Sequence, residues 1–445
     1  MNQPTDGSEE RTVKDQQIYE RAIKVMPGGL SRNVLLRQQF PRYVDRASGA
    51  YVTDTNGVTR IDFANNIASM IHGHAHPAIV EAVCEQVRKG TAFNLGTEVE
   101  VSYAELLCNR VPGFEKLRFV NSGTEAVMAM LKAARAYTGR PKIAKAEGGY
   151  HGSYDTAEIS QSASPANWGS IDSPNSVPHV YGTPEGVTDN VVIYPFNDTE
   201  RTIKILDRHK DEIACVLVDP MPHRIGLIKA DDEFMEALRK WTTENGALLC
   251  FDEVICFRVE YEGAQSLFKV KPDLTSMGKI IGGGFPIGAF AGKTEIMNVL
   301  DPTHDLFRFA LSGTFSANPI SLTAGKVTME MLDREAVKKI NRMTTIAIRQ
   351  VTEAGKVAGI PLSITGSGSM FKVHFREDPP RSYRDVFEDE KAQKVNRTFL
   401  KHLFDEGVML IYSCSCVLST VITQKEIDIL SDAMLSAFRR IKPML

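Results

Sequence analysis

The chain has 445 residues, of which 43% are hydrophobic and 24% charged, a balance typical of a folded globular protein and not of a disordered or fibrous one. Its formal net charge is −3, and no run of five or six like charges occurs, so we expect no nucleic-acid partner. The polar residues 1–14 and the lack of any apolar run near the roughly 18 residues of a membrane span predict a cytoplasmic protein without a membrane partner.

The N-terminal part predicts a small, mixed element. A polar lead runs into a helix that we expect to end near the PGG at residues 27–29. Short strand-like runs follow at residues 50–53 and 61–63, separated by turn residues at 54–57. These runs predict a small antiparallel element.

From residue 77 onward, helical segments alternate with short, continuous apolar runs. The runs lie at residues 117–120, 213–218 and 247–251. Continuous runs suit strands that are covered on both faces, so they predict an α/β fold with a mostly parallel sheet wrapped by helices. The loop at residues 162–186 has little periodicity and is typical of a lid or binding loop.

A different pattern begins after residue 332. Helical stretches at residues 334–359 and 391–406 surround strand-like pieces near 371–375 and 417–421. This alternation predicts a separate, smaller α+β domain.

The first motif that carries chemistry is NSGTEA at residues 121–126, which follows an apolar strand and opens a helix. Ser122 and Glu125 have the spacing of a capping box, which is a purely structural interpretation. In the functional interpretation, Gly123 lets the backbone approach an anion that accepts the free N–H groups of the first helical turn. The motif alone leaves both open.

The second motif is Asp252-Glu253-Val254, directly after the strand near residues 246–251. Adjacent residues of a strand point to opposite faces, so the two acids cannot act as a pair on one substrate, whereas Asp252 and Val254 share a face. Ligands of open α/β sheets lie beyond the carboxyl ends of the strands, where Asp252 could hold a protonated heterocyclic nitrogen. A helix N-cap or a surface acid is the alternative.

The third motif places Lys279 between apolar residues and just before the glycines at 282–284. A lysine that forms an imine must be partly desolvated so that its amine is neutral, although a solvated loop lysine is the alternative. An anion cradle, a carboxylate for a ring nitrogen and an imine-forming lysine are together what pyridoxal phosphate requires.

These motifs resemble those of the class III aminotransferases, and specifically of their glutamate-1-semialdehyde 2,1-aminomutase-like branch. The matching segments are spread over most of the chain: PGG at 27–29, GHAHP at 73–77, NSGTEA at 121–126, GGYHG at 148–152, FDEV at 251–254, PDL at 272–274, GK at 278–279, GTFSANP at 313–319 and DEGV at 405–408. The resemblance implies fold type I of the pyridoxal-phosphate enzymes, with a large cofactor-binding domain at 75–332 and a small α+β domain built from segment 1–74 and from 333–445.

The resemblance also implies a role for each matching residue. Lys279 would form the Schiff base with the cofactor and shuttle the substrate proton, and Asp252 would keep the pyridine nitrogen protonated. Tyr150 would stack on one ring face and Val254 would pack on the other, although Tyr150 could also be an ordinary core aromatic. The phosphate would be held by Ser122, Gly123 and Thr124.

Two more residues extend the implied site. Thr314 would complete the phosphate site of the other subunit, which implies a homodimer. Arg32 aligns with an arginine that binds the substrate carboxylate in relatives, and a plain surface arginine is the alternative. His72, His74 and His76 would share one face of a strand, but the pattern also fits a turn into a helix at Pro77, and we predict no metal site.

Four positions depart from the aminomutase pattern. The aminomutases carry a Trp in the segment that reads NNIAS at 65–69 and an acidic residue in the segment that reads SCSC at 413–416. A β-amino-acid aminotransferase relative has an Arg in that second segment, which this chain also lacks. Asp219 stands where relatives usually have Glu, and the segment at residues 252–258 is one residue shorter than in the aminomutases.

We therefore predict a pyridoxal-phosphate aminotransferase that moves an amino group between a carboxylate-bearing α- or β-amino acid and a keto acid through Lys279. The alternatives on the same fold are glutamate-1-semialdehyde 2,1-aminomutase and a racemase. A further alternative is a non-catalytic or nucleotide-binding α/β protein that uses residues 121–125 as a plain phosphate site. The identity of the two substrates and the stereochemical preference are not predicted.

Overall fold

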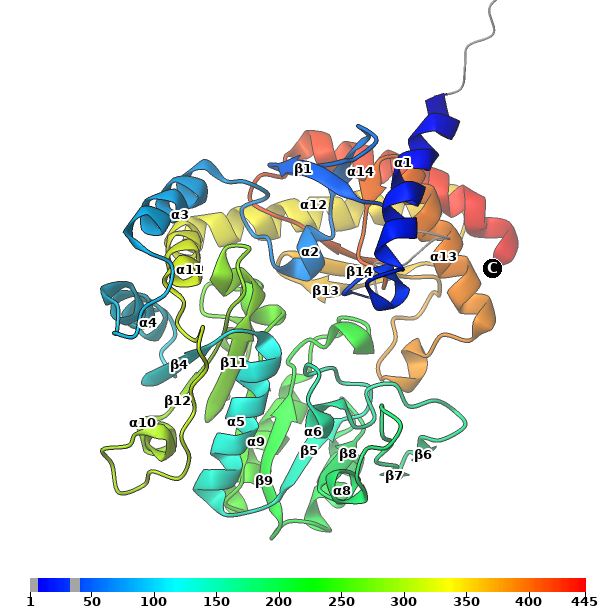
Figure 1. Cartoon of the computed structure of the whole chain (residues 1–445). Helices are drawn as coiled ribbons and strands as arrows, with labels where there is room; N and C mark the ends of the chain where they lie inside the picture. Colours follow the sequence, from blue (N-terminus) through cyan, green and yellow to red (C-terminus); the bar gives the residue numbers. More distant parts are fainter. Residues whose placement is uncertain (1–6, 33–40) are drawn as a thin grey trace, which may run out of the picture.

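The computed structural model describes residues 7–32 and 41–445, and within them a seven-stranded sheet forms the centre of the molecule (Figure 1). The strand order is β4-β12-β11-β10-β9-β5-β8. Neighbouring strands are parallel except β12, which is antiparallel to both β4 and β11. This arrangement confirms the predicted mostly parallel sheet. The strands are β4 (Lys116–Val120), β5 (Lys142–Ala146), β8 (Val191–Tyr194), β9 (Ile213–Val218), β10 (Leu248–Asp252), β11 (Leu274–Gly278) and β12 (Gly288–Gly292).

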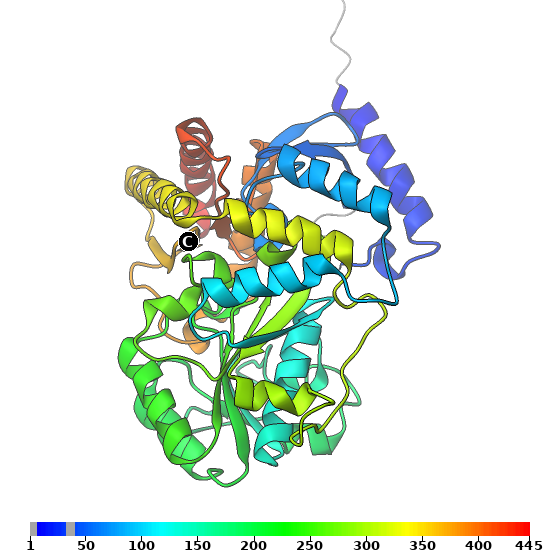
Figure 2. The same ribbon diagram turned by 90° about the vertical axis from the view of Figure 1, so that its left-hand side faces the viewer.

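Helices cover both faces of this sheet, as the continuous apolar runs predict (Figure 2). Helix α5 (Gly123–Thr138) lies on one face, and α8 (Thr199–Asp207) and α9 (Asp232–Glu244) lie on the other. In β9, Leu217 belongs to the core cluster of α5, whereas Val216 and Val218 belong to that of α8 and α9. Each apolar side chain of the run is therefore buried, which stabilises the sheet by about 25 cal/mol per Å² of apolar surface.

A second lobe lies above the sheet in Figure 1 and combines both ends of the described chain. One of its sheets joins β1 (Val44–Ser48), β2 (Tyr51–Asp54) and β3 (Thr59–Asp62) to β15 (Val408–Met409), which pairs in parallel with β3. Another sheet joins β13 (Ser363–Ser367), β14 (Met370–His374) and β16 (Ser415–Val417). The long helices of this lobe are α12 (Arg334–Ala358), α13 (Glu390–Asp405) and α14 (Gln424–Ile441). The predicted antiparallel element of β2 and β3 is confirmed, and the domain boundaries themselves stay a prediction.

The remaining elements are one hairpin and the other helices. The hairpin consists of β6 (Gly169–Ser170) and β7 (Ser173–Pro174), within the long loop that the sequence predicts. The other α-helices are α1 (Gly7–Ala22), α2 (Asn65–Ala68), α3 (Pro77–Lys89), α4 (Glu98–Arg110), α6 (Asp155–Glu158), α7 (Glu185–Thr188), α10 (Thr294–Met297) and α11 (Pro319–Met331). The 3-10 helices are η1 (Pro27–Gly29), η3 (His223–Ile225), η4 (Cys256–Arg258), η5 (Ala264–Leu267), η6 (Lys279–Gly282), η7 (Asn298–Leu300), η8 (Arg384–Val386) and η9 (Lys442–Met444).

Two predicted elements differ from the structure. The first helix ends at Ala22, and residues 27–29 form the separate η1, where Gly28 has a φ of 65° that does not continue a helix. The strand predicted at 417–421 is wrong, because β16 ends at Val417. Beyond it, the chain turns to the N-terminal segment, where the N–H of Thr420 donates to the carbonyl of Ile71.

The buried side chain of Arg258 joins three segments of the molecule. Its Nε donates to Ser369 Oγ at 2.8 Å and its Nη1 to the carbonyl oxygen of Ala68 at 2.9 Å. Its Nη2 donates to the carbonyl oxygen of Leu418. Burial lowers the pKa of Arg258 to about 9. The guanidinium thus ties the segment after β10 to both terminal parts of the second lobe.

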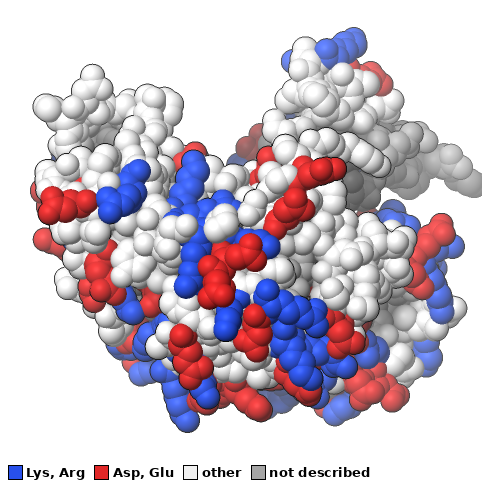
Figure 3. Space-filling view, turned by 90° about the horizontal axis from the view of Figure 1, so that it is seen from below, with Lys and Arg blue, Asp and Glu red and all other residues white. Residues whose placement is uncertain are grey.

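Charged side chains of both signs are intermixed on the face seen in Figure 3, in keeping with the small net charge. Within the described residues, no helix is long and apolar enough to cross a membrane. The cytoplasmic location stays a prediction.

Helix α11 packs closely on η6 at Gly325. A Cβ at Gly325 would lie 2.0 Å from the carbonyl oxygen of Ile281 and 2.9 Å from a ring carbon of Tyr103. The hydroxyl of Tyr103 donates to that same carbonyl at 2.5 Å, so neither neighbour is free to move away. Because Ile281 follows Lys279 by two residues, this contact helps to set the position of the lysine.

We expect Gly325→Ala to lower the free energy of unfolding by about 1 to 3 kcal/mol, because the added methyl group overpacks a backbone contact. Urea unfolding measures this change. Gly186→Ala in α7 is the matched control, since no heavy atom lies within 4 Å of the position that its added methyl group would take, and its effect should stay within about 0.5 kcal/mol. Equal stability of the two variants would contradict the packing argument.

Candidate active site

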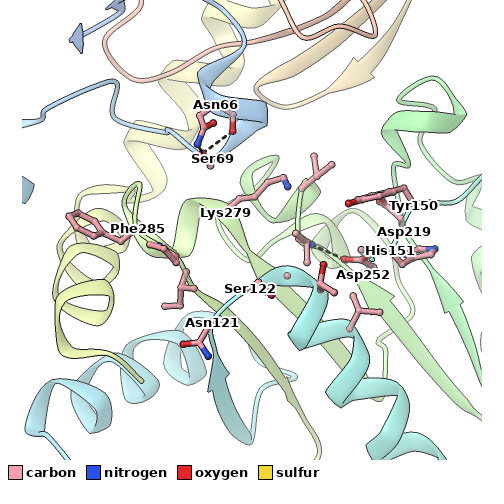
Figure 4. A pocket seen from close by; sticks show the side chains of 18 of the residues that line it. Asn66, Ser69, Asn121, Ser122, Tyr150, His151, Asp219, Asp252, Lys279 and Phe285 are labelled. Atoms are coloured by element: carbon pink, nitrogen blue, oxygen red, sulfur yellow. Dashed lines mark hydrogen bonds and ion pairs between the residues drawn. The ribbon is translucent and has the colours of Figure 1, made fainter. Parts of the chain in front are cut away.

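A cavity of about 540 Å³ lies at the carboxyl ends of the central strands, between the sheet and the second lobe (Figure 4). Its lining includes every residue that the sequence predicts for the site except Thr314. The predicted residues that line it are Arg32, Ser122, Gly123, Thr124, Tyr150, Asp252, Val254 and Lys279. The fold therefore gathers at one place segments that lie far apart in the sequence.

The N-terminus of α5 forms one wall. Ser122 is the N-cap, and its Oγ accepts the N–H of Glu125 at 3.1 Å. The predicted capping box is only half correct, because the Glu125 carboxylate accepts the N–H of Asn121 at 2.7 Å and not that of Ser122. The N–H groups of Gly123 and Thr124 belong to the first turn and have no intrahelical acceptor, so an anion such as a phosphate can use them.

Asp252, the last residue of β10, has a fixed carboxylate. Its Oδ2 accepts His151 Nδ1 at 2.8 Å, and its Oδ1 accepts the N–H of Val254 at 3.0 Å and Ser276 Oγ at 3.1 Å. Only 4% of the residue is exposed. Donors from three segments thus hold the carboxylate in one orientation at the edge of the cavity, as a partner for a cationic ring N–H must be.

His151 is a residue of the site that the sequence analysis missed. Burial lowers its pKa, and the bond to Asp252 offsets this only in part, so the imidazole is neutral and donates through Nδ1. Its Nε2 is buried without a hydrogen-bond partner in the described part of the chain. The sequence gives one indication of this role, because His151 lies beside Tyr150 in the GGYHG segment. Its partner Asp252 is identified only in the folded structure, where this loop lies next to β10.

Glu253 points away from the cavity, as strand alternation predicts. Its carboxylate accepts the N–H groups of Ala264 at 2.6 Å and Gln265 at 2.9 Å, at the start of η5. Burial raises the pKa of Glu253 to about 8. The second acid of the motif therefore has a structural role in capping a short helix.

A second carboxyl group, that of Asp219, also lines the cavity. It accepts the N–H of Met221 at 2.9 Å and Cys256 Sγ at 3.4 Å. Burial, followed by the charge of Asp252, raises the pKa of Asp219 to about 8. The neutral form of Asp219 is thus favoured, which reduces the repulsion between two carboxyl groups of the site.

Lys279 begins η6 directly after β11 and is partly buried in the cavity. Burial is the main cause of its lowered pKa; the Arg32 charge adds to this effect, and Asp252 and Asp219 oppose it. Its φ of 50° lies in the left-handed region, which is rare for a residue with a side chain and is common at functional sites. The lysine thus has the dry surroundings that a neutral amine needs.

Tyr150 and Val254 supply flat and apolar surface. The Tyr150 ring is partly exposed to the cavity and meets the ring of His223 edge to face at 6.1 Å between centroids. Val254 occupies the space above Gly123, where an added Cβ would lie 2.7 Å from its Cγ1. Glycine at 123 therefore lets α5 and the segment after β10 approach each other around the cavity.

The other predicted residues lie as follows. Arg32 donates from Nη1 to Asn66 Oδ1 at 2.7 Å. Thr314 is exposed in the loop before α11. His72 contacts Thr420 Oγ1 and the carbonyl of Thr328, and His74 contacts Asp62. No group of three side chains in the described residues is placed to hold a metal ion.

Comparison with known proteins agrees with this geometry. The sequence matches the family described as aminotransferase class-III over residues 36–438. A glutamate-1-semialdehyde 2,1-aminomutase of Methanocella arvoryzae is 38% identical over 398 residues, which is 88% of this chain and 90% of the relative.

Solved structures agree as well. An omega-transaminase from Sphaerobacter thermophilus superposes with a TM-score of 0.94 at 42% identity, over 96% of this chain and 98% of the other. A transaminase with PLP bound superposes with a TM-score of 0.89 at 41% identity, over 97% of this chain and 98% of the other.

The residues of the cavity fit pyridoxal phosphate. The free N–H groups at the start of α5 suit its phosphate, the fixed carboxylate of Asp252 suits its ring nitrogen, and the desolvated amine of Lys279 suits its aldehyde. With a family match over most of the sequence, the chain belongs to the class-III aminotransferases, is an enzyme of fold type I and uses pyridoxal phosphate as its cofactor.

Proposed function

We propose that this enzyme moves an amino group from a carboxylate-bearing α- or β-amino acid to a keto acid. The observation that carries the proposal is the guanidinium of Arg32 on the wall of the cavity that also contains Lys279 and Asp252. A guanidinium binds a carboxylate through two parallel hydrogen bonds, so it suits one end of an amino or keto acid. Solved transaminases at 41% and 42% identity support the same reaction class.

Each residue then has a definite task. The cofactor, when bound, supplies an electron sink for the bonds at the substrate carbon. Lys279 Nζ takes the proton from that carbon, because burial favours its neutral form, and would deliver it to the carbon of the cofactor that gains the amino group. The negative charge of Asp252 stabilises the ammonium form that results. We assign the phosphate to Ser122, Gly123 and Thr124, the ring nitrogen to Asp252 and the ring faces to Tyr150 and Val254.

Glutamate-1-semialdehyde 2,1-aminomutase is the second candidate, because a 38% identical relative has that name. An aminomutase and a racemase would use the same lysine and carboxylate. They differ from an aminotransferase in needing no separate keto acid and in releasing none. The requirement for an acceptor therefore separates the candidates.

We expect the holoenzyme, given an amino acid and no acceptor, to release about one keto product per site and then stop, and to resume when a keto acid is added. Chromatography of the keto acids measures this. Lys279→Ala should reduce the rate by about 10³-fold or more, because it removes the group that transfers the proton. Conversion of glutamate-1-semialdehyde without a released keto product would instead identify an aminomutase. If the only change were a loss of optical activity of the amino acid, the enzyme would be a racemase.

The protonation of Lys279 gives a second test. The apoprotein should capture added pyridoxal phosphate faster as the pH rises through the pKa of Lys279, since only the neutral amine attacks an aldehyde. The Arg32 charge lowers this pKa, so Arg32→Gln should raise it and move the increase in rate to higher pH. Stopped-flow absorbance measures the rate.

The control for this test is Arg201→Gln. Arg201 pairs with Asp172 and Asp198 on the surface and does not act on Lys279. Its rate profile should match that of the wild type. A profile of Arg32→Gln that stays in place or moves to lower pH would contradict the assigned proximity of Arg32 and Lys279.

We further propose a homodimer in which Thr314 completes the phosphate site of the partner subunit. Thr314 is exposed and lies outside the lining of its own chain's cavity. Its neighbour Phe315 is 61% exposed, and Leu95, in the loop between α3 and α4, is 83% exposed. A partner that covers these two loops would bury both apolar side chains.

Thr314→Asp should weaken cofactor binding about tenfold or more, because a hydrogen bond to the phosphate is replaced by like-charge repulsion. Thr345→Asp, on the exposed side of α12, should have no such effect. Subunits of Thr314→Asp, when mixed and reassembled with subunits of Lys279→Ala, should form one intact site per mixed dimer. If no site in the mixture bound the cofactor tightly and was active, the proposal of a shared phosphate site would be contradicted.

A further inference from the structure

Residues Asn65–Ala68, assigned to α2, form a left-handed turn. Their φ values are 47°, 48°, 54° and 64°. This conformation is unfavourable for L-residues, least so for asparagine and most for a β-branched residue such as Ile67. Backbone strain of this kind persists only where the surroundings impose it, and it is concentrated at functional sites.

Contacts from both lobes hold the turn in place. The Asp62 carboxylate accepts the N–H groups of Ala64 and Asn65, each at 2.9 Å. The side-chain amide of Asn65 donates to the carbonyl oxygen of Val417 at 2.7 Å. Arg258 donates to the carbonyl oxygen of Ala68 at 2.9 Å. The turn is thus fixed at its start and at its end.

The turn places Asn66 and Ser69 on the wall of the cavity, near Lys279 (Figure 4). The Ser69 hydroxyl donates to the Asn66 carbonyl oxygen at 2.9 Å, so its oxygen can accept the Asn66 Nδ2 at 3.0 Å. This pair of bonds sets the orientation of the amide group. Asn66 Oδ1 therefore faces Arg32 and accepts its Nη1 at 2.7 Å.

A neutral acceptor at this place has a specific effect on Arg32. The amide oxygen orients the guanidinium without cancelling its charge, as a carboxylate would. No carboxylate of the described residues lies within ion-pair distance of Arg32. Of its five N–H donors, the bond to Asn66 uses one and leaves a pair for a planar oxyanion.

We propose that Asn66, held in the left-handed turn, is the positioning residue that aims Arg32 at the carboxylate of the substrate. This inference rests on the proposed function, which gives Arg32 that carboxylate. Asn66 thereby sets the preference for substrates that carry a carboxylate over substrates that lack one, without contacting the reacting atoms. Ser69 acts indirectly, because it fixes the amide of Asn66, which in turn orients Arg32.

The test uses the holoenzyme with alanine or 3-amino-3-phenylpropanoate as donor, whichever the wild type converts faster. Asn66→Gly removes the side chain and keeps a residue that adopts positive φ readily. We expect its KM for the donor to rise about three- to tenfold, because one hydrogen bond to a charged group is lost. Its kcat should stay within about twofold of the wild-type value. The melting temperature should stay within about 2 °C.

Two further variants separate the possible causes. In an Arg32→Ala background, Asn66→Gly should change the KM less than about 1.5-fold, because Asn66 acts through Arg32. Asn197→Gly is the matched control, since Asn197 has a φ of 59° and does not line the cavity. Its KM should equal that of the wild type.

The outcomes are distinguishable. If Arg32→Ala leaves the KM for the donor unchanged, the proposed function fails. If Arg32→Ala raises the KM but Asn66→Gly does not, only the role of Asn66 is overturned. An equal effect of Asn66→Gly with and without Arg32 would also overturn it, because Asn66 would then act independently.

Discussion

The carboxylate of Asp252 is held by donors from His151, Ser276 and its own turn, and the placement of the other groups in the cavity depends on it. Ser276 belongs to the neighbouring parallel strand, so the same bond that orients the Asp252 carboxylate also ties it to the strand that leads into Lys279. In this way two adjacent strand ends set the distance between Asp252 and Lys279.

Desolvation is the second general constraint, and it has different consequences for different groups. Burial favours the neutral forms of Lys279, His151 and Asp219 alike. Lys279, His151 and Asp219 thus add little to the charges of Asp252 and Arg32 that the site already holds. Burial also requires that each polar group has a partner, which accounts for the contacts of Glu253 with η5 and of Arg258 with three segments.

The sequence predicts those parts of the site that depend on local spacing. Asp252 and the start of α5 lie at the ends of strands that are evident from their apolar runs, Lys279 is marked by its apolar neighbours and the glycines that follow it, and the family motifs supply their roles. Contacts between distant segments are a different matter. The bonds of His151 to Asp252 and of Asn66 to Arg32 join residues 101 and 34 positions apart, and no periodicity encodes them. The end of β16 likewise depends on its pairing with the N-terminal segment.

The parallel pairing of β3 with β15 has a consequence for biosynthesis. Val408 pairs with Ile61 in this parallel ladder, and the N–H of Val417 donates to the carbonyl oxygen of Phe63. Ile61 and Phe63 therefore reach their final pairing only after nearly the whole polypeptide has left the ribosome. The central sheet uses strands that are complete by Gly292 and is free to fold before then. A nascent chain is therefore able to assemble the floor of the cavity first, whereas the wall that contains Asn66 closes only after translation is almost finished.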